Sequence, residues 1–200
     1  MILFGASGHA KVILDILKKN GVVVSCIYDD APKVTEIFSV PVRINSLKSD
    51  EKEDAVISIG NNKIRKSISE KFPYLNYLTS IHPRAVISEF SEIGKGTVIM
   101  ANVTVNPDVK IGDHCILNTG CVIEHDCSLG NFVHISPNAA LSGNVEIGEG
   151  SHIGVGASVI QGVKIGKWCT VGAGAAIIND VPDYSVVVGV PGRIIKSVNT

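Results

Sequence analysis

The second half of the chain places an aliphatic residue at every sixth position. The series begins at Ile81 and reaches Ile177 without a gap, through Ile87, Ile93, Ile99, Val105, Ile111, Leu117, Ile123, Leu129, Ile135, Leu141, Ile147, Ile153, Val159, Ile165 and Val171. From Ile87 onward, the residue four places after each of these is small, from Ser91 to Ala175. A fixed period of this kind indicates a repeat protein. We expect one bulky and one small side chain per hexad to point inward and fill the core.

A longer period of 18 residues is superimposed on the hexads. The segments EIGKGT, KIGDHC, SLGNFV, EIGEGS and KIGKWC begin at 92, 110, 128, 146 and 164. Three hexads therefore complete one coil of a triangular prism, whose short parallel strands stack ~4.8 Å apart along the axis. We expect Gly94, Gly112, Gly130, Gly148 and Gly166 to form a corner with a left-handed backbone, which glycine adopts at little cost.

The first half alternates strand-like and helix-like patterns instead. An apolar run at 2–4 precedes a helical pattern over 10–21, and a second helical pattern covers 63–72. Further strand candidates lie at 22–30 and 54–62. This alternation predicts a parallel sheet with helical crossovers, an α/β, Rossmann-like βαβ domain over residues 1–78. A prism domain over 79–183 and a C-terminal segment over 184–200 would complete the chain.

Composition narrows the classes of function. A formal net charge of −1 gives no broad attraction to nucleic acid or to anionic lipid. No apolar run reaches the ~18 residues of a membrane span, and the N-terminus has no signal-peptide pattern, so we expect a cytoplasmic protein. The five cysteines form no CxxC pair, and four occupy the small-residue position of the hexads: Cys115, Cys121, Cys127 and Cys169. We expect these to be reduced, inward-facing thiols.

The histidines supply candidate chemistry. His125 is followed by Asp126, and His134 lies nine residues further on. Neither histidine occupies the aliphatic or the small position, so both should face outward, on different walls of the prism. They could serve one site only where neighbouring prisms meet. The residues alone allow an exposed turn histidine bonded to Asp126, a general base oriented by that carboxylate, or a zinc ligand, although His114, His125, His134 and His152 include no HxxxxH pair.

A second candidate site follows the first predicted strand. In GASGHAKV, Gly5 and Gly8 allow a tight turn, and free amides at the start of a helix suit phosphate. Asp29 and Asp30 come about 20 residues later at a strand end, where the ribose or base of a nucleotide would lie. The full GxGxxG motif is absent. The alternatives are therefore a nucleotide pocket or a simple turn beside an exposed acidic pair.

The hexads, GASGHAKV, the YDD strand end, NTGCVIEHDC and the closing GVPGR together resemble the hexapeptide-repeat sugar acyltransferases, over nearly the whole chain. Within that family the sequence is similar to the UDP-4-amino-sugar N-acetyltransferases of the UDP-N-acetylbacillosamine type. The sialic acid O-acetyltransferases and the GDP-perosamine N-acetyltransferases share the pattern. The resemblance implies a left-handed parallel β-helix, acetyl-CoA as co-substrate, no metal and a homotrimer.

The resemblance also implies roles for individual residues. His125 would be the catalytic general base, followed by Asp126 where the UDP-bacillosamine enzymes carry Glu, a departure that leaves the sugar open. The nucleotide sugar would contact Gly8, His9, Asp29, Asp30, Gly60, Asn61 and Asn118. Acetyl-CoA would contact His134, Gly143, Val155, Ala173 and Arg193, with a backbone N–H of Gly143 facing the carbonyl oxygen. For the last three of these, an ordinary wall position or a solvated side chain is the alternative.

We therefore expect an acetyl-CoA-dependent N-acetyltransferase. Its acceptor would be the amino group of a nucleotide-linked sugar such as a UDP-4-amino-4,6-dideoxy-N-acetylglucosamine, which attacks the thioester directly. The alternatives are a sugar or sialic acid O-acetyltransferase, a metal-dependent hydratase like the β-helix carbonic anhydrases, and a non-catalytic nucleotide-sugar-binding scaffold. Apolar residues outside the hexad core, at 98, 100, 116, 122 and 160, favour pairing with further copies of the chain.

Overall fold

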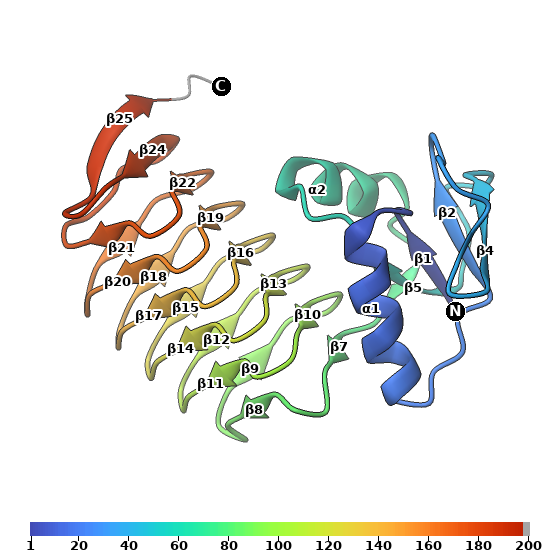
Figure 1. Cartoon of the computed structure of the whole chain (residues 1–200), viewed down its shortest axis with the longest axis horizontal. Coiled ribbons are helices and arrows are strands. Elements are labelled where there is room, and N and C mark those ends of the chain that lie inside the picture. Colours follow the sequence, from blue (N-terminus) through green and yellow to red (C-terminus); the bar gives the residue numbers. More distant parts are fainter. Residues whose placement is uncertain (198–200) are drawn as a thin grey trace.

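A computed structural model describes residues 1–197. Figure 1 shows an N-terminal sheet domain lying beside a prism of stacked coils. The N-terminal sheet has the order β3-β4-β2-β1-β5-β6. All its pairs are parallel except the hairpin of β3 and β4. Its strands are β1 (Ile2–Phe4), β2 (Cys26–Asp29), β3 (Glu36–Ile37), β4 (Val40–Ile44), β5 (Asp54–Ile57) and β6 (Asn76–Tyr77).

Two helices cover this sheet, α1 (Gly8–Lys19) and α2 (Asn62–Lys71). The buried side of α1 consists of Ala10, Ile13, Leu14, Ile16 and Leu17, the helical spacing seen in the sequence. It packs with one face of the sheet, while α2 packs with the other through Ile68 and the C-cap residue Phe72. The predicted parallel sheet with helical crossovers is confirmed, although α1 begins two residues earlier than expected and the hairpin was not foreseen.

Strand order places two loops next to each other. Because β2 and β5 flank β1 on opposite sides, the loops that follow β1 and β5 lie at the point where the strand order reverses. Open α/β sheets bind ligands in the crevice at this point. The loop after β1 begins at Gly5 and leads into α1 at Gly8, and the loop after β5 carries Gly60 and Asn61.

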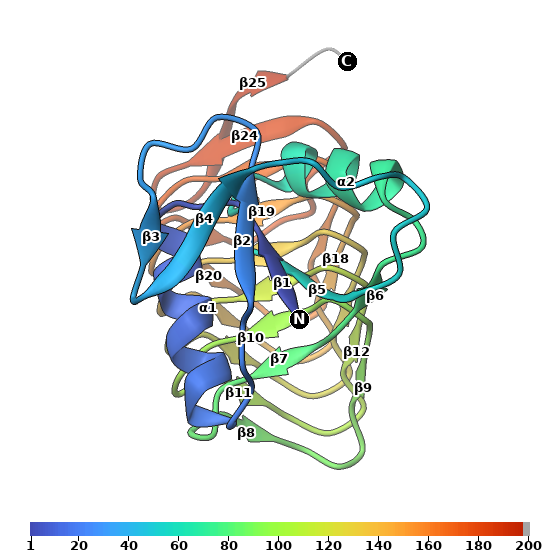
Figure 2. The ribbon, with the colours of Figure 1, turned by 90° about the vertical axis from the view of Figure 1, so that its right-hand side faces the viewer.

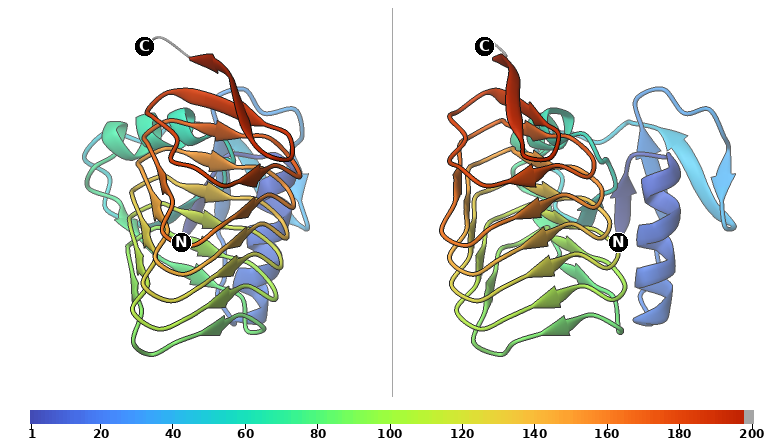
Figure 3. Two further views of the ribbon diagram at one scale, coloured as in Figure 1. Left: turned by 90° about the vertical axis from the view of Figure 1, so that its left-hand side faces the viewer. Right: turned by 60° about the vertical axis from the view of Figure 1, so that its left-hand side comes forward.

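The second half forms a parallel β-helix with three walls, which Figure 3 shows in two further views. The first wall contains β7 (Ser80–Ile81), β10 (Val98–Ile99), β13 (Ile116–Leu117), β16 (His134–Ile135), β19 (His152–Ile153), β22 (Thr170–Val171), β24 (Ser185–Val188) and β25 (Arg193–Ser197). The second contains β8 (Val86–Ile87), β11 (Thr104–Val105), β14 (Val122–Ile123), β17 (Ala140–Leu141), β20 (Ser158–Val159) and β23 (Ala176–Ile177). The third contains β9 (Glu92–Ile93), β12 (Lys110–Ile111), β15 (Ser128–Leu129), β18 (Glu146–Ile147) and β21 (Lys164–Ile165).

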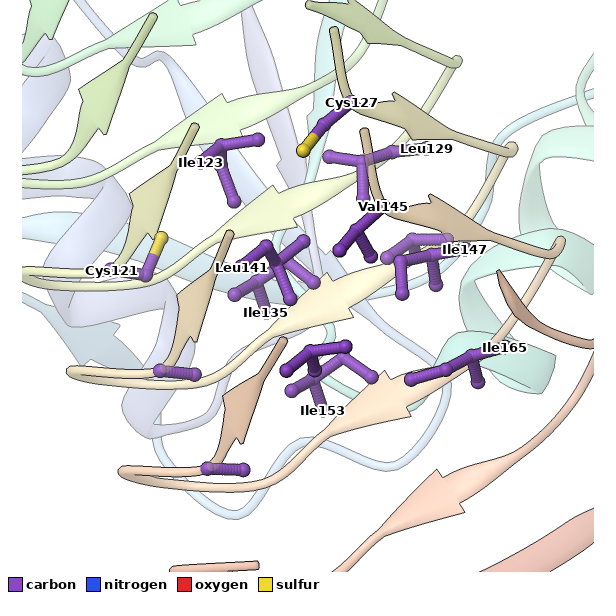
Figure 4. Close-up of a cluster of buried hydrophobic side chains, with 14 of the residues drawn as sticks. Cys121, Ile123, Cys127, Leu129, Ile135, Leu141, Val145, Ile147, Ile153 and Ile165 are labelled. Atoms are coloured by element: carbon purple, nitrogen blue, oxygen red, sulfur yellow. The ribbon is translucent and has the colours of Figure 1, made fainter. Parts of the chain in front are cut away.

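The core of the prism is the one that the hexads predict. Strand partners lie 18 residues apart, as Leu117 and Ile135 show. Every bulky hexad residue from Ile99 to Ile177 and every small one from Val103 to Ala175, apart from Ser151, belongs to one buried hydrophobic cluster. Figure 4 shows side chains of this cluster pointing toward one another inside the coils, with Cys121 and Cys127 among them.

The inward position explains the chemistry of the cysteines. All five are free and buried. Burial raises the pKa of Cys115 and of Cys121 to about 12, because a thiolate is poorly solvated in an apolar core. These thiols are therefore protonated at neutral pH and act as small apolar side chains.

The prediction of a left-handed glycine corner was wrong in position. The left-handed residues lie two places further on, at every sixth position from Gly96 to Gly174, and many are not glycine, as His114, Asp126 and Asn144 show. Gly148 and its equivalents are required for space instead. A Cβ atom at Gly148 would lie 2.6 Å from the backbone carbon of Gly166 in the next coil.

The three walls of the prism differ in how far the rest of the chain covers them. The first wall is covered by the N-terminal domain, because Val98, Met100 and Ile116 are buried in one cluster with the apolar face of α1. Figure 2 shows the two helices lying over this side of the prism. Three of the five apolar positions expected to pair with other copies are thus covered by the chain itself, which corrects that expectation. Val122 is half-buried and Ile160 is exposed on the second wall.

The C-terminal segment continues the prism. The strand β24 pairs in parallel with β22, and β25 turns back antiparallel along β24 at the edge of the first wall. Within residues 1–197, no helix is long and apolar enough to cross a membrane.

Candidate functional site

His125 and Asp126 lie at the corner between the second and third walls, in the turn from β14 to β15. His125 Nδ1 and Asp126 Oδ2 are 2.7 Å apart, and both side chains are exposed. The hydrogen bond to Asp126 raises the pKa of His125 above its ordinary value. Asp126 has a left-handed backbone with a φ of 62°, and its carboxylate contacts the ring of the preceding residue. The pair is an accessible imidazole with an orienting carboxylate.

Gly143 lies one coil further along the same corner. A Cβ atom at Gly143 would lie 2.8 Å from His125 Nε2, so the ring rests directly over this residue. No acceptor within residues 1–197 takes the backbone N–H of Gly143, so this donor is without a partner there. A side chain at this position would displace the ring, so glycine is required here for the approach of His125.

His134 lies on the first wall, away from His125 and under the N-terminal domain. It faces outward from the prism, as expected, but it is only 8% exposed because the N-terminal domain covers it. Its ring stacks on that of His152 in the next coil at 4.6 Å and meets the edge of His9 at 6.1 Å. Asn118 Nδ2 lies 3.2 Å from His134 Nε2. The structure thus brings His9, Asn118 and His134 together, and it adds His152, which we did not predict.

Burial keeps these histidines uncharged. Desolvation is the main cause that lowers the pKa of His9 to about 4 and that of His134 to about 3, and the Arg65 cation lowers both further. The pKa of His152 is also lowered, by burial first and by Arg65 second. At neutral pH each ring has one N–H and one lone pair. This cluster can therefore donate and accept hydrogen bonds, but it differs from His125 in that it does not readily gain a proton.

The glycine-rich turn presents an uncapped helix start. Ser7 is the N-cap of α1 but makes no side-chain hydrogen bond to it. Asn61, in contrast, caps α2 by accepting a hydrogen bond from the Ile64 N–H at 3.0 Å. The free amides of α1 begin at Gly8, beside a cavity of about 340 Å³ that also reaches Lys11. Free amides and the helix dipole at this point suit an anion such as phosphate.

The acidic pair after β2 has structural partners. Asp29 accepts hydrogen bonds from the Ala6 N–H at 2.7 Å and from the Ala31 N–H at 2.9 Å, so its carboxylate braces the glycine-rich turn. Asp30 is exposed and accepts a hydrogen bond from Asn45 Nδ2 at 2.9 Å. Asp29 is therefore next to the turn that we expect to hold the nucleotide, and Asp30 lies beside it on the surface.

A cavity of about 490 Å³ lies where α2 meets the first wall. Gly60, Asn61 and Lys63 line one side, and His134, His152 and Trp168 are among the residues on the other. Loop residues from the switch point and wall residues from the prism therefore share one pocket. A larger hollow of about 740 Å³ follows the third wall, but none of the predicted site residues lines it.

The remaining predicted residues lie apart from this pocket. Val155 and Ala173 are exposed at the corner between the first and second walls, one coil apart. Arg193 is exposed at the start of β25, where it donates a hydrogen bond to the carbonyl oxygen of Gly192. Their predicted contacts with acetyl-CoA remain predictions. Within residues 1–197, no group of three or more His, Cys, Asp or Glu side chains could hold a metal ion.

Sequence reasoning missed the residues that join the two domains. Arg65 and Asn62 lie on α2 with a spacing of three, which in a sequence is typical of a solvated helix face. Both are buried, Arg65 to 1% exposure, because that face of the helix meets the prism. No local pattern marks a buried arginine whose partners are backbone carbonyls 49 and 67 residues away.

Family comparisons match both halves of the chain. Residues 1–72 match the family described as PglD N-terminal domain. Residues 90–125, 108–143 and 144–179 match the family described as bacterial transferase hexapeptide (six repeats). A UDP-N-acetylbacillosamine N-acetyltransferase of Bacillus subtilis (strain 168) is 40% identical over 108 residues, which is 50% of this chain and 50% of that protein. The match thus spans about half the length of that curated relative.

Solved structures match over nearly the whole length of the chain. PerB from Caulobacter crescentus, in complex with CoA and GDP-perosamine, is 38% identical with a TM-score of 0.92, over 98% of this chain and 96% of that one. The acetyltransferase domain of PglB from Neisseria gonorrhoeae FA1090, in complex with acetyl coenzyme A, is 37% identical with a TM-score of 0.89, over 97% and 98%. With this identity over nearly full length, the chain belongs to the PglD-type hexapeptide-repeat N-acetyltransferases.

Proposed function

We propose that the protein transfers the acetyl group of acetyl-CoA to the amino group of a nucleotide-linked amino sugar, with His125 as general base. The observation that carries this proposal is the His125–Asp126 pair, 2.7 Å apart and exposed over Gly143, in a chain that matches structures bound to CoA and GDP-perosamine along its length. The proposal does not specify the nucleotide or the sugar, and a UDP-4-amino sugar is the first candidate substrate.

The chemistry follows from the state of His125. A sugar amine must be neutral to attack a thioester, so a base has to accept one proton from its nitrogen. The nitrogen bonds to the acetyl carbonyl carbon, the bond from that carbon to sulfur breaks, and the proton passes through His125 to the leaving thiolate of CoA. The backbone N–H of Gly143 supports the negative charge on the carbonyl oxygen in between. No cysteine takes part, because all five thiols are buried.

The nucleotide is proposed to bind at the N-terminal domain. The uncapped start of α1 at Gly8 would hold the diphosphate, while Asp29 and Asp30 would face the nucleoside. His9, Gly60 and Asn61 lead from this turn to the first wall, where Asn118 and His134 would meet the sugar and the acetyl group. The cavity between Gly60 and His134 supports this path.

The two halves of such a site lie on different sides of one chain. His125 lies between the second and third walls, whereas His134 lies on the first, so the halves can meet only between subunits. The second wall suits a contact between copies, because its outward residues are small or apolar: Val86, Thr104, Val122, Ala140, Ser158 and Ala176. The third wall carries charged residues such as Glu92, Lys110 and Lys164. We propose a homotrimer with one site in each seam, in which Val155, Ala173 and Arg193 meet CoA.

A donor and acceptor screen tests this function. Wild-type protein with acetyl-CoA and a panel of UDP-amino sugars, GDP-amino sugars and sialic acids should give an acetylated amine by mass spectrometry. His125→Ala should lower kcat by about 10²- to 10⁴-fold, as expected for loss of a general base. An acetylated hydroxyl would favour O-acetylation instead. Release of no CoA with any acceptor would contradict the proposal and favour a binding scaffold.

Subunit mixing tests the shared site with the same variant. His125→Ala and His134→Asn chains should each be inactive alone, and their mixed trimers should regain part of the activity, because some seams contain both native halves. A mixture that stays inactive, or a monomer by light scattering, would contradict a site shared between copies.

A further inference from the structure

The first turn of α2 is bonded to the prism through a column of backbone oxygens. His114, Phe132 and Gly150 occupy equivalent positions in three successive coils, 18 residues apart, at the corner between the third and first walls. Within residues 1–197, no backbone N–H donates to the carbonyl oxygens of these three residues. Each oxygen instead accepts a hydrogen bond from a side chain of α2.

Arg65 donates hydrogen bonds to two of these three oxygens. Its Nε donates to the His114 oxygen at 2.7 Å, and one terminal nitrogen donates to the Phe132 oxygen at 2.9 Å. Asn62 binds the third oxygen, because its Nδ2 donates to the Gly150 oxygen at 2.9 Å. The first turn of α2 is thus held in register with three coils at once.

The same guanidinium holds the loop after β5. Its other terminal nitrogen donates to the carbonyl oxygens of Ile59 at 3.0 Å and Gly60 at 3.2 Å. The Asn62 side-chain oxygen accepts a further bond at 2.8 Å. Five N–H donors therefore meet five acceptors, the full capacity of a guanidinium.

None of these five acceptors is a carboxylate, although Arg65 is almost fully buried. A buried cation without a counter-ion is costly, and an apolar side chain would serve to fill the space. The arrangement is specific in another respect: only a planar five-donor fork can join the loop and two coils at a single point. Its effect is to fix the loop of Gly60 and Asn61 relative to the wall that carries His134.

We infer that Arg65, together with Asn62, is a positioning residue that sets the nucleotide-sugar side of the pocket against the prism. This rests on the proposed function, since it assigns the loop after β5 to the nucleotide sugar. The prism wall itself is held by its own strand pairing. Loss of Arg65 should therefore displace the loop and weaken nucleotide binding, while the CoA contacts on the prism remain.

Lys66 provides a matched control. It also joins α2 to the prism, through an ion pair with Glu149 at 2.5 Å and through the rings of Phe132 and Trp168. It makes no hydrogen bond to the loop of Gly60. If holding α2 to the prism were all that mattered, loss of Lys66 would have the same effect as loss of Arg65.

Calorimetric titration of the full chain with UDP, GDP and CoA tests the inference. In Arg65→Lys, which keeps the charge but not the fork, and in Asn62→Ala, the Kd of the nucleotide that the wild type binds should rise roughly 10- to 100-fold, as for a displaced positioning group. The Kd of CoA should stay within about twofold by the same reasoning, and Lys66→Met should change neither.

Unchanged nucleotide affinity in Arg65→Lys and Asn62→Ala would overturn the inference, as would an equal loss of both ligands. Asn62→Ala keeps Arg65 in place, so it allows the test even where the arginine variant fails to fold. A wild type that binds neither nucleotide would overturn the proposed function and this inference with it. If the wild type binds a nucleotide but the variants do not behave as expected, only the proposed role of Arg65 is overturned.

Discussion

Asp126 has two effects on His125: its charge raises the basicity of the ring, and its hydrogen bond orients the ring. A substitution can separate these two effects. The carboxylate raises the pKa of His125 through their hydrogen bond. An amide at position 126 would still accept that bond from Nδ1 and would tolerate the left-handed backbone, as Asn144 does one coil further on. Replacement of Asp126 by Asn therefore removes mainly the charge.

A pH profile of Asp126→Asn measures this effect. A general base acts when it is deprotonated, so the acid limb of kcat/KM in the wild type should lie above the ordinary histidine pKa of ~6.5. In Asp126→Asn the pKa of His125 falls, so the limb should move to lower pH, while the plateau drops by about tenfold or more with the weaker base. Asp108→Asn, one coil earlier at the same corner, is the control. An unmoved limb in Asp126→Asn would count against His125 as the titrating base.

At the level of the element, the corner of a hexad imposes two separate requirements on the residues that form it. One position needs a left-handed backbone, and asparagine meets this need at Asn102 and Asn138. Another position, two residues earlier, needs the absence of a side chain when the next coil lies directly against it, as at Gly148. Glycines of the two kinds look alike in the sequence, but their replacement is costly for different reasons.

Two substitutions separate these demands. Gly148→Ala should lower the free energy of unfolding by about 1–3 kcal/mol, because the added Cβ meets backbone atoms of Gly166 and Lys167 that cannot move aside. Gly162→Asn should change it by about 0.5 kcal/mol or less, because the space there is open and asparagine tolerates the backbone. Urea denaturation followed by circular dichroism checks both. Equal losses would refute the distinction.

Across the whole molecule, the buried histidines couple stability to pH. His114 stacks on Phe132 at 5.3 Å beneath the N-terminal domain, and burial lowers its pKa to about 4. In the unfolded chain the pKa returns to ~6.5, so the unfolded state binds the proton first as pH falls. This contribution to stability is complete above pH ~6.5 and is lost progressively as pH falls toward 4. His9 and His134 act in the same direction.

His114→Phe isolates one of these groups. Phenylalanine occupies the equivalent position in the next coil, at Phe132, with a similar backbone φ of 61°. The variant should keep its Tm at pH 7.5, and its Tm should fall less than that of the wild type between pH 7 and pH 5. Differential scanning fluorimetry over this range is the measurement. Parallel Tm curves for the two proteins would show that His114 does not contribute.

Much of the fold follows from local pattern. The hexads predicted the prism and its inward side chains because each coil repeats the same contacts, so the period of the chain is also the period of the core. Periodicity likewise predicted α1 and α2 and the parallel sheet. The motif around His125 identified a histidine and carboxylate pair because its two members are neighbours in the chain.

The rest depended on contacts that no local pattern carries. Whether a glycine corner is strained or crowded depends on the coil 18 residues away, as at Gly148. His134 is buried, and Arg65 holds the pocket loop, only because the sheet domain packs on the first wall. The repeat and the His125–Asp126 pair can thus be read from the chain, because the first arises from a period and the second from adjacent residues. The sequence does not reveal which outward residues are covered. Their burial depends on contact between two surfaces that meet only after both domains have folded.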